Sequence, residues 1–278
     1  HELLNAGHDV QVLEAQSRIG GRIYTLRDPF APGLYGEAGA MRIPQSHRLT
    51  LAYIEKFGLK TYPFTIDNPL AYSYIGGKRH RLSEIRQNPD LLGFDFYPSE
   101  QGRQVGQMWA DALEPILERL RTEGEDAWDE IYEEYDIYSV REFLEVKAWS
   151  EGAIEAFGLL HNQESMMNSS FLELLREEVG EFYTNLLQIE GGSDRLPQAF
   201  FPGLKERIRF GARVIALDQT PDIVTVHYQT AAGRFSLQAD HAILTIPFPV
   251  MRHIEVLKPF SRLKQRAIRQ LHYDASAK

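Results

Sequence analysis

The 278-residue chain contains no cysteine, which excludes a thiol nucleophile, a disulfide bond and a thiolate-bound metal. It also lacks an apolar run of the ~20 residues that a membrane-spanning helix needs. The longest apolar run, residues 242–251, is interrupted by two prolines. The nine histidines show no paired spacing typical of a metal site. We therefore expect neither a membrane span nor a bound metal.

Clusters of positive charge are missing as well. Lysine and arginine total 30 against 39 acidic residues, the net charge is -9, and the basic residues are scattered along the chain. A nucleic acid or an anionic membrane is therefore not an expected partner. Hydrophobic residues make up 43% of the sequence, as in an ordinary soluble protein, and this composition suits a cytoplasmic or a secreted protein equally.

The two ends of the sequence have unusual patterns. The chain begins with HELLNAGH, without a methionine, and it ends in LHYDASAK. The stretch ELLNAG is typical of the last turn of a helix, terminated here by Gly7. We therefore expect the sequence to be an internal segment of a longer protein.

The first hundred residues alternate between strand and helix patterns. Residues 8–15 alternate in polarity and predict a strand, and residues 22–26 predict a second, shorter one. Residues 46–58 predict a helix. Residues 71–82 form two extended runs around a Gly-Gly pair, which is typical of a β-hairpin.

Between about residues 100 and 187 the period of the apolar residues becomes helical. Apolar side chains in the range 105–120 fall on one helix face, and Pro115 among them is expected to kink the helix. Two capping boxes are expected, at residues 139–142 and 170–173, because each pairs a serine with a glutamate three positions later.

Short strands return after the helical stretch. They are expected at residues 207–219, 222–229, 234–239 and 241–247 and are separated by turn residues. This pattern predicts a β-meander closed by a more buried strand. The order of a βα beginning, a helical insert and a β-rich return indicates a discontinuous α/β domain.

Glu14 ends the first predicted strand. In dinucleotide-binding units an acidic residue at that position binds the ribose, about 20 residues after a glycine-rich turn that holds the pyrophosphate. That turn would precede residue 1. Taken alone, Glu14 is better explained as an ordinary surface glutamate at a strand end.

Gly20, Gly21 and Arg22 follow six to eight residues later. Two glycines let backbone amides approach a phosphate closely, and an arginine adds a charged fork. The alternative is a simple glycine-rich turn. A ribose acceptor and a phosphate donor so close together favour a nucleotide site.

The stretch YGEAGAMRIP, residues 35–44, contains small residues that could lie along a flat cofactor. Arg42 is flanked by apolar side chains, so its charge requires an anionic partner. That partner is either a structural carboxylate such as Glu37 or the carboxylate of a substrate held in a bidentate pair. Sequence position leaves the two possibilities open.

Five motifs in order resemble the flavin amine oxidase family, and most closely its L-amino-acid oxidase branch. They are VLEA with IGGR (12–22), GAMRIP (39–44), GGSDRLP (191–197), ARVIAL (212–217) and HAILTIP (241–247). The resemblance implies an α/β fold with a discontinuous, Rossmann-like FAD-binding domain of the GR2 type, a β-rich substrate domain and a helical insert. The implied segments are 1–47 and 188–272 for the FAD-binding domain, 48–97 and 273–278 for the substrate domain, and 98–187 for the insert.

The resemblance also implies roles for individual residues. The substrate carboxylate would be bound by Arg42, and a water near the flavin would be held by Lys278. GGSDRLP would be a scaffold turn. Venom-type relatives have a histidine on the substrate side where this chain has Glu177. The residues implied for FAD binding are Glu14, Ala15, Gly20, Gly21, Arg22, Gly39, Ala40, Met41, Arg42 and Val214.

The function implied by the resemblance is FAD-dependent oxidation of L-α-amino acids to 2-oxo acids, ammonia and hydrogen peroxide, in a homodimer, with dioxygen as co-substrate. The isolated segment could be inactive. One alternative is a monoamine or polyamine oxidase, which Arg42 argues against because an amine has no carboxylate. Others are an amino-acid 2-monooxygenase that forms an amide, and a flavin-binding protein without turnover.

Overall fold

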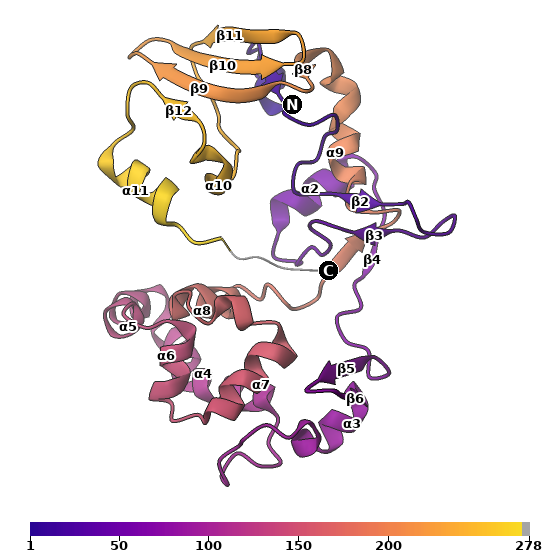
Figure 1. Cartoon of the computed structure of the whole chain (residues 1–278), viewed down its shortest axis with the longest axis vertical. Coiled ribbons are helices and arrows are strands. Elements are labelled where there is room, and N and C mark those ends of the chain that lie inside the picture. Colours follow the sequence, from indigo (N-terminus) through magenta and orange to yellow (C-terminus); the bar gives the residue numbers. More distant parts are fainter. Residues whose placement is uncertain (274–278) are drawn as a thin grey trace. The chain divides into compact units, whose positions relative to one another are not determined.

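The computed structural model describes residues 1–273, and within them the chain divides into two compact units (Figure 1). The first unit comprises residues 1–42, 49–62 and 188–273, and the second comprises residues 43–48 and 63–187. The helical segment expected at 98–187 lies wholly within the second unit. The five segment boundaries expected from the sequence stay predictions.

Helices dominate the middle of the chain. The α-helices are α1 (Glu2–Asn5), α2 (Arg48–Lys56), α3 (Leu82–Gln87), α4 (Val105–Glu123), α5 (Ala127–Tyr135), α6 (Val140–Val146), α7 (Glu151–His161), α8 (Phe171–Val179), α9 (Arg195–Phe200), α10 (Phe248–Met251) and α11 (Arg262–Gln270). The short 3-10 helices are η1 (Pro89–Leu92), η2 (Gly124–Asp126), η3 (Glu164–Met166), η4 (Phe201–Gly203) and η5 (Lys205–Arg207).

Strands lie on either side of this helical region. They are β1 (Val12–Leu13), β2 (Thr25–Leu26), β3 (Gly36–Glu37), β4 (Thr61–Pro63), β5 (Tyr72–Ile75), β6 (Lys78–Arg81), β7 (Leu187–Ile189), β8 (Ile208–Arg209), β9 (Arg213–Gln219), β10 (Val224–Thr230), β11 (Gly233–Ala239) and β12 (Glu255–Val256). Four two-stranded pairs form, β1–β8, β2–β3, β4–β7 and β5–β6, beside one four-stranded sheet in the order β11–β10–β9–β12.

The four-stranded sheet confirms the predicted meander. Strands β9, β10 and β11 are antiparallel, and Val226 of β10 lies opposite Leu217 on one side and Leu237 on the other. The strand predicted at 241–247 is wrong, since those residues have no strand partner and Ile243 is 75% exposed. The short β12, parallel to β9, occupies the sheet edge instead.

Two other predicted strands are shorter than expected. The strand predicted at 8–15 is reduced to β1, because its parallel partner β8 offers only two residues for pairing. The strand predicted at 22–26 is reduced to β2. The hairpin predicted at 71–82 is confirmed, with Gly76 and Gly77 both at positive φ between β5 and β6.

The core of the second unit is built on α4. Val105, Met108, Trp109, Leu113 and Ile116 are all buried, so the helical stripe read from the sequence is confirmed. Pro115 lies inside this helix without ending it. Aromatic rings complete the core, and those of Phe143 and Phe171 stack with centroids 3.7 Å apart.

The helix ends predicted at Gly7, Ser139 and Ser170 are confirmed, the helix predicted at 46–58 is shorter, and one of the two predicted capping boxes is absent. Gly7, at φ 88°, follows α1, and the N–H of His8 donates to the carbonyl of Leu3, as in a Schellman motif. Ser139 and Glu142 form a complete capping box on α6. Ser170 is the N-cap residue of α8, but its side chain makes no capping bond, so the box predicted there is wrong.

Two further findings concern the described part of the chain. None of the helices in residues 1–273 is both long enough and apolar enough to cross a membrane. The same residues contain no group of three or more His, Asp or Glu side chains placed to hold a metal ion.

Candidate functional site

Glu14 lies directly after β1, at the carboxyl end of the parallel β1–β8 pair. Its N–H donates to the carbonyl of Arg209, and its own carbonyl accepts from the N–H of Ala212, both at 2.9 Å. The backbone of Glu14 is therefore held on both sides. One carboxylate oxygen accepts the N–H of Gln16 at 2.7 Å, while Oε2 has no hydrogen-bond partner within residues 1–273. An oxygen acceptor is thus available at the strand end.

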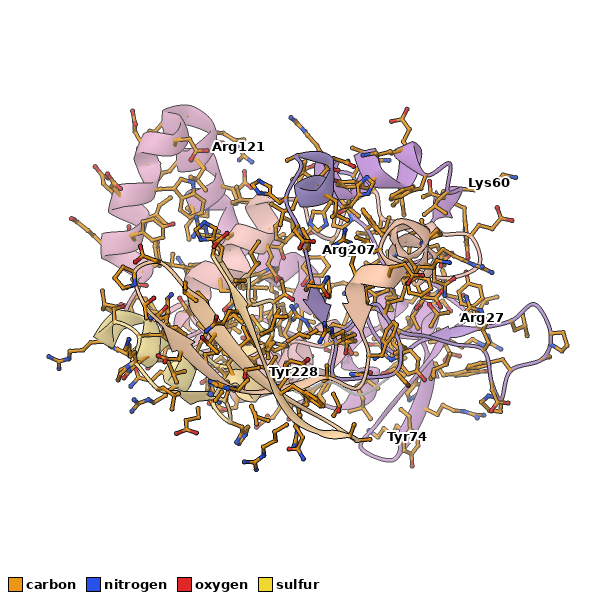
Figure 2. All side chains as sticks on the ribbon, turned by 90° about the horizontal axis from the view of Figure 1, so that it is seen from above. Arg27, Lys60, Tyr74, Arg121, Arg207 and Tyr228 are labelled. Atoms are coloured by element: carbon orange, nitrogen blue, oxygen red, sulfur yellow. The ribbon has the colours of Figure 1, made fainter. Side chains whose placement is uncertain are left out.

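Val214 is brought close to Glu14 through Ala212. It is the second residue of β9, and its register partner is Tyr228 of β10; Tyr228 is labelled in Figure 2. The phenol of Tyr228 accepts a hydrogen bond of 2.6 Å from Arg209, which flanks Glu14 on β8. The resemblance implies separate FAD contacts for Glu14 and Val214. In the structure the two residues are linked through the hydrogen bonds of Ala212, Arg209 and Tyr228.

The Gly-Gly pair forms a left-handed turn. Gly20 and Gly21 have φ of 101° and 54°, and the N–H of Ile23 donates to the carbonyl of Gly20 at 2.8 Å. A Cβ on Gly20 would lie 2.6 Å from the Ile23 oxygen, so only glycine fits. The amides of Gly21 and Arg22 have no acceptor among the described residues. Consecutive free amides in such a turn suit an anion such as a pyrophosphate.

Arg18, which sequence reasoning missed, holds this turn in shape. Its guanidinium donates to the carbonyl of Gly21 at 2.9 Å and more weakly to those of Ile19 and Ile23. The same group lies over the ring of Tyr24, 4.1 Å from its centroid. The sequence signal for this role was an arginine just ahead of a Gly-Gly pair, because such a side chain can reach several carbonyls of the turn.

The GAMR segment runs antiparallel to the Gly-Gly-Arg turn. The N–H of Ala40 donates to the carbonyl of Arg22 at 3.1 Å, and this ladder continues into the β2–β3 pair. A Cβ on Gly39 would lie 2.0 Å from the Arg22 oxygen. The two motifs are therefore a single ribbon, and Gly39 permits its close backbone contact. We name residues 20–26 with 36–42 the cofactor ribbon, after the role that the resemblance implies for them.

A network of polar groups ties the cofactor ribbon to the GGSDRLP turn. The buried Thr25 hydroxyl donates to Glu37 Oε2 at 2.8 Å and accepts from the Asp194 N–H at 3.2 Å. Glu37 Oε1 accepts from the Ser193 N–H at 2.7 Å. Gly192, at φ 111°, packs against Thr25 so closely that its Cβ would lie 2.5 Å from the methyl group. Glu37 thus has a structural role in this network.

Asp194 is the charged member of this network. Its carboxylate forms a bidentate pair with Arg27, with both N–O distances 2.8 Å, and Arg27 also donates to the Gly191 carbonyl. Burial alone would raise the pKa of the Asp194 carboxyl, but the Arg27 guanidinium and the Thr25 hydroxyl oppose it and hold that pKa below its usual value.

Replacing Asp194 with asparagine should therefore destabilise the protein at neutral pH. We expect a loss of about 1–2 kcal/mol, because the Arg27 side chain is 43% exposed and solvent screens part of the pair. The folded-state pKa lies below the unfolded value of about 3.9. The stabilisation is thus fully present above that pH and is lost as the pH falls through the folded-state pKa.

Urea unfolding of the wild type and Asp194→Asn at pH 7 and at descending pH below 4 tests this prediction. The difference in unfolding free energy should close as the pH falls. The exposed Asp240→Asn is the matched control and should show no difference at either pH. A difference in unfolding free energy that does not change with pH would mean that Asp194 stabilises the protein through its shape and not its charge.

The remaining predicted residues occupy different places. Met41 and Arg42 are half-buried at the end of the cofactor ribbon, and Ala15 is exposed. Glu177, on α8 in the second unit, accepts a 2.6 Å hydrogen bond from the Tyr183 hydroxyl. Lys278 lies outside the described residues.

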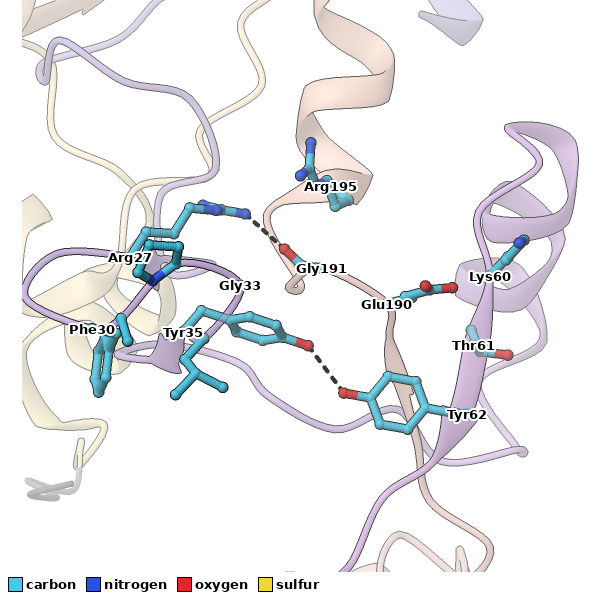
Figure 3. Close-up of a pocket in the computed structure, with 13 residues that line it drawn as sticks. Arg27, Phe30, Gly33, Tyr35, Lys60, Thr61, Tyr62, Glu190, Gly191 and Arg195 are labelled. Atoms are coloured by element: carbon cyan, nitrogen blue, oxygen red, sulfur yellow. Dashed lines mark hydrogen bonds between the residues drawn. The ribbon is translucent and has the colours of Figure 1, made fainter.

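A large open cavity of about 1110 Å³ lies beside the polar network (Figure 3). Arg27, Lys60 and Arg195 line it together with Tyr35 and Tyr62, whose hydroxyls are 3.0 Å apart. Burial and the neighbouring Tyr62 hydroxyl raise the pKa of Tyr35 to about 12. Tyr35, Gly191 and Arg195 of this lining belong to stretches that the sequence analysis singled out, but no residue of the cofactor ribbon lines the cavity.

Comparison with known proteins gives consistent results. The family model described as "Flavin containing amine oxidoreductase" matches residues 1–278. The chain is 39% identical over 283 residues to a Bacillus subtilis protein named "Putative L-amino-acid oxidase YobN", and 36% identical over 279 residues to an L-amino acid oxidase of Lachesis muta. Each alignment covers 99% of this chain, and 59% and 53% of those relatives.

Solved structures show the same fold. Wild-type putrescine oxidase bound to putrescine superposes with a TM-score of 0.63 at 19% identity, over 96% of this chain and 59% of that one. In sequence and in structure, the chain therefore spans little more than half the length of the proteins it matches.

Proposed function

Because this chain belongs to the family of flavin-containing amine oxidoreductases, we propose that the protein oxidises L-α-amino acids to 2-oxo acids with FAD as cofactor. Ammonia and hydrogen peroxide would be the other products, from dioxygen and water as co-substrates. The relatives named as L-amino-acid oxidases, at 36–39% identity over the whole chain, support this substrate class.

Family membership also confirms three of the sequence-based inferences. These are the resemblance read from the five motifs, the α/β fold of an FAD-binding protein and a flavin cofactor. The roles of individual residues and the homodimer stay predictions.

The cofactor ribbon and the β1–β8 pair fit a flavin dinucleotide. Glu14 offers an unused carboxylate oxygen for a ribose hydroxyl, and the amides of Gly21 and Arg22 are donors for a pyrophosphate. Gly39 keeps the ribbon flat by allowing backbone contact at a distance that no side chain permits. When bound, FAD supplies the two-electron redox chemistry that no amino-acid side chain provides.

The observation that carries the substrate class is the place of Arg42, directly after the ribbon segment assigned to the flavin. A guanidinium binds a carboxylate through two parallel hydrogen bonds, which fixes orientation as well as position. In our proposal Arg42 holds the α-carboxylate so that the Cα–H of the amino acid faces the cofactor. Such positioning lowers the activation free energy by several kcal/mol in favourable cases, on the order of ~7 kcal/mol.

Anaerobic mixing tests this proposal. The purified protein, loaded with FAD, is mixed with a panel of L-amino acids and with the corresponding decarboxylated amines, and the absorbance of oxidised flavin is followed. We expect L-amino acids alone to bleach it. Arg42→Ala should lower kcat/KM by about 10²–10³-fold, because truncating one partner of a buried charge pair costs 2–5 kcal/mol.

Matched variants make the outcome specific. Arg42→Lys keeps the charge but not the fork and should fall between the wild type and Arg42→Ala, while the exposed Arg48→Ala should leave the rate unchanged. Bleaching by the amines would contradict the proposal and identify an amine oxidase. An amide product under air, in place of a 2-oxo acid, would identify a monooxygenase.

A further inference from the structure

The large cavity of Figure 3 lies wholly within the first unit, and three segments of the chain form its walls. The loop of residues 27–35 lies on one side, β4 with residues 60–62 on the other, and the turn of residues 190–195 between them. Its volume of about 1110 Å³ is sufficient for a small organic molecule, since pockets for such molecules usually measure roughly 300–1,000 Å³. None of the residues assigned to FAD or to the amino acid lines it.

Hydrogen bonds tie the three walls to one another. The hydroxyls of Tyr35 and Tyr62, 3.0 Å apart, join the loop to β4. Arg27 of the loop donates to the carbonyl of Gly191 in the turn at 2.7 Å, and β7, which leads into this turn, pairs with β4. The protein itself therefore holds the walls in place, so that little ordering is needed when a ligand binds.

Two cations in these walls lack an anionic partner among residues 1–273. Lys60 and Arg195 both line the cavity and are exposed, and neither side chain forms an ion pair or a hydrogen bond within that part of the chain. Arg27, the third cation of the lining, is neutralised by Asp194. The one carboxylate of the lining belongs to Glu190. Two unpaired cations against one carboxylate leave the cavity with one positive charge in excess.

Large aromatic and apolar side chains form much of the remaining lining. Phe30, Leu34 and Tyr62 are all exposed to solvent. The edge of the Phe30 ring packs against Gly36, whose Cβ would lie 2.9 Å from it. Burial and the Tyr62 hydroxyl raise the pKa of Tyr35 to about 12, so the Tyr35 phenol is uncharged at neutral pH and does not repel an anion. The cavity therefore combines excess positive charge with aromatic surface that a ligand can reach.

We propose that this cavity binds an aromatic monocarboxylate whose body has about two rings. The Arg195 guanidinium donates two parallel hydrogen bonds to the carboxylate, and the Lys60 ammonium adds attraction without a fixed geometry. The rings pack against Phe30 of the loop or Tyr62 of β4, because offset and edge-to-face contacts between aromatic rings are favourable. A phosphate dianion fits less well, since one excess positive charge balances one negative charge.

Calorimetric titration of the purified full chain, loaded with FAD, with naphthalene-2-carboxylate at pH 7 tests the site. We expect saturable binding that is at least tenfold weaker in Arg195→Gln, because the charged fork is lost. Glu190→Gln should bind at least twofold more tightly, since it removes the negative charge of the lining. Arg234→Gln, a change of the same charge at an exposed position on β11, should bind like the wild type.

A second ligand and two further variants separate this site from others. Naphthalene-2-methanol, which has the same rings but no charge, should bind at least tenfold more weakly than the carboxylate. Phe30→Ala removes one aromatic wall and should weaken binding at least threefold, whereas Arg42→Ala should retain it, because Arg42 does not line this cavity. No binding to the wild type, equal binding to Arg195→Gln, or loss of binding in Arg42→Ala would each overturn the proposal.

Discussion

The Gly39→Ala protein is expected to purify with less than a tenth of the wild-type flavin content. The added methyl group would lie 2.0 Å from the Arg22 carbonyl oxygen, which is backbone on the opposite strand and cannot move aside as a side chain could. The cofactor ribbon must therefore separate at this point, at a cost of about 1–3 kcal/mol or more for overpacking. The ratio of flavin to protein absorbance after purification measures the effect.

Gly203→Ala is the matched control for this change. A Cβ at Gly203 meets no atom within 4 Å, and its backbone is outside the left-handed region, so flavin content should stay at the wild-type level. Far-ultraviolet circular dichroism should show that Gly39→Ala still folds. Full flavin retention by folded Gly39→Ala would show that the ribbon is not part of the cofactor site.

The Glu100→Ala protein is expected to lose about 3–5 kcal/mol of unfolding free energy, through breakage of a buried charged network. Glu100 is 5% exposed, and its carboxylate accepts the N–H of Tyr97 at 2.8 Å, the N–H of Ser150 at 2.9 Å and the hydroxyl of Ser150 at 2.5 Å. That hydroxyl in turn caps α7 by accepting the N–H of Ala153. Removing the carboxylate therefore leaves buried donors unpaired and loosens the helix start.

Denaturant unfolding monitored by helical circular dichroism measures this loss. Glu100→Gln keeps one acceptor and should be destabilised by less than half as much as Glu100→Ala. Glu155→Ala, at an exposed position on α7, should unfold like the wild type. Similar stabilities for all three variants would show that the network contributes nothing net.

Local sequence signals predicted the elements whose contacts are close in the chain. The hairpin β5–β6, the stripe on α4 and the capping box of Ser139 all depend on residues within a few positions of one another. Ser170 matches the same capping pattern as Ser139, and the two serines share one backbone bridge, yet only Ser139 forms its capping box. Sequence spacing alone therefore does not determine which serine side chain caps its helix.

The candidate site shows the same difference between residues that local sequence predicts and contacts that only the fold determines. The types of residue at Glu14, Gly20 and Gly39 predict a nucleotide site, which stays a prediction, and the structure shows why positions 20 and 39 require glycine. The part played by Glu37 was not predictable, because its partners Thr25 and Ser193 are fixed by the fold.

The bond between Glu37 and Ser193 spans 156 positions of the chain. A ribosome adds roughly 5–20 residues per second. The strands β2 and β3 of the first unit are therefore synthesised about 8–30 seconds before the GGSDRLP turn to which they bond. The helices of the second unit emerge during that interval and have local contacts with which to fold. We therefore expect the first unit to complete its fold after the helical second unit, although its first strands are synthesised earlier.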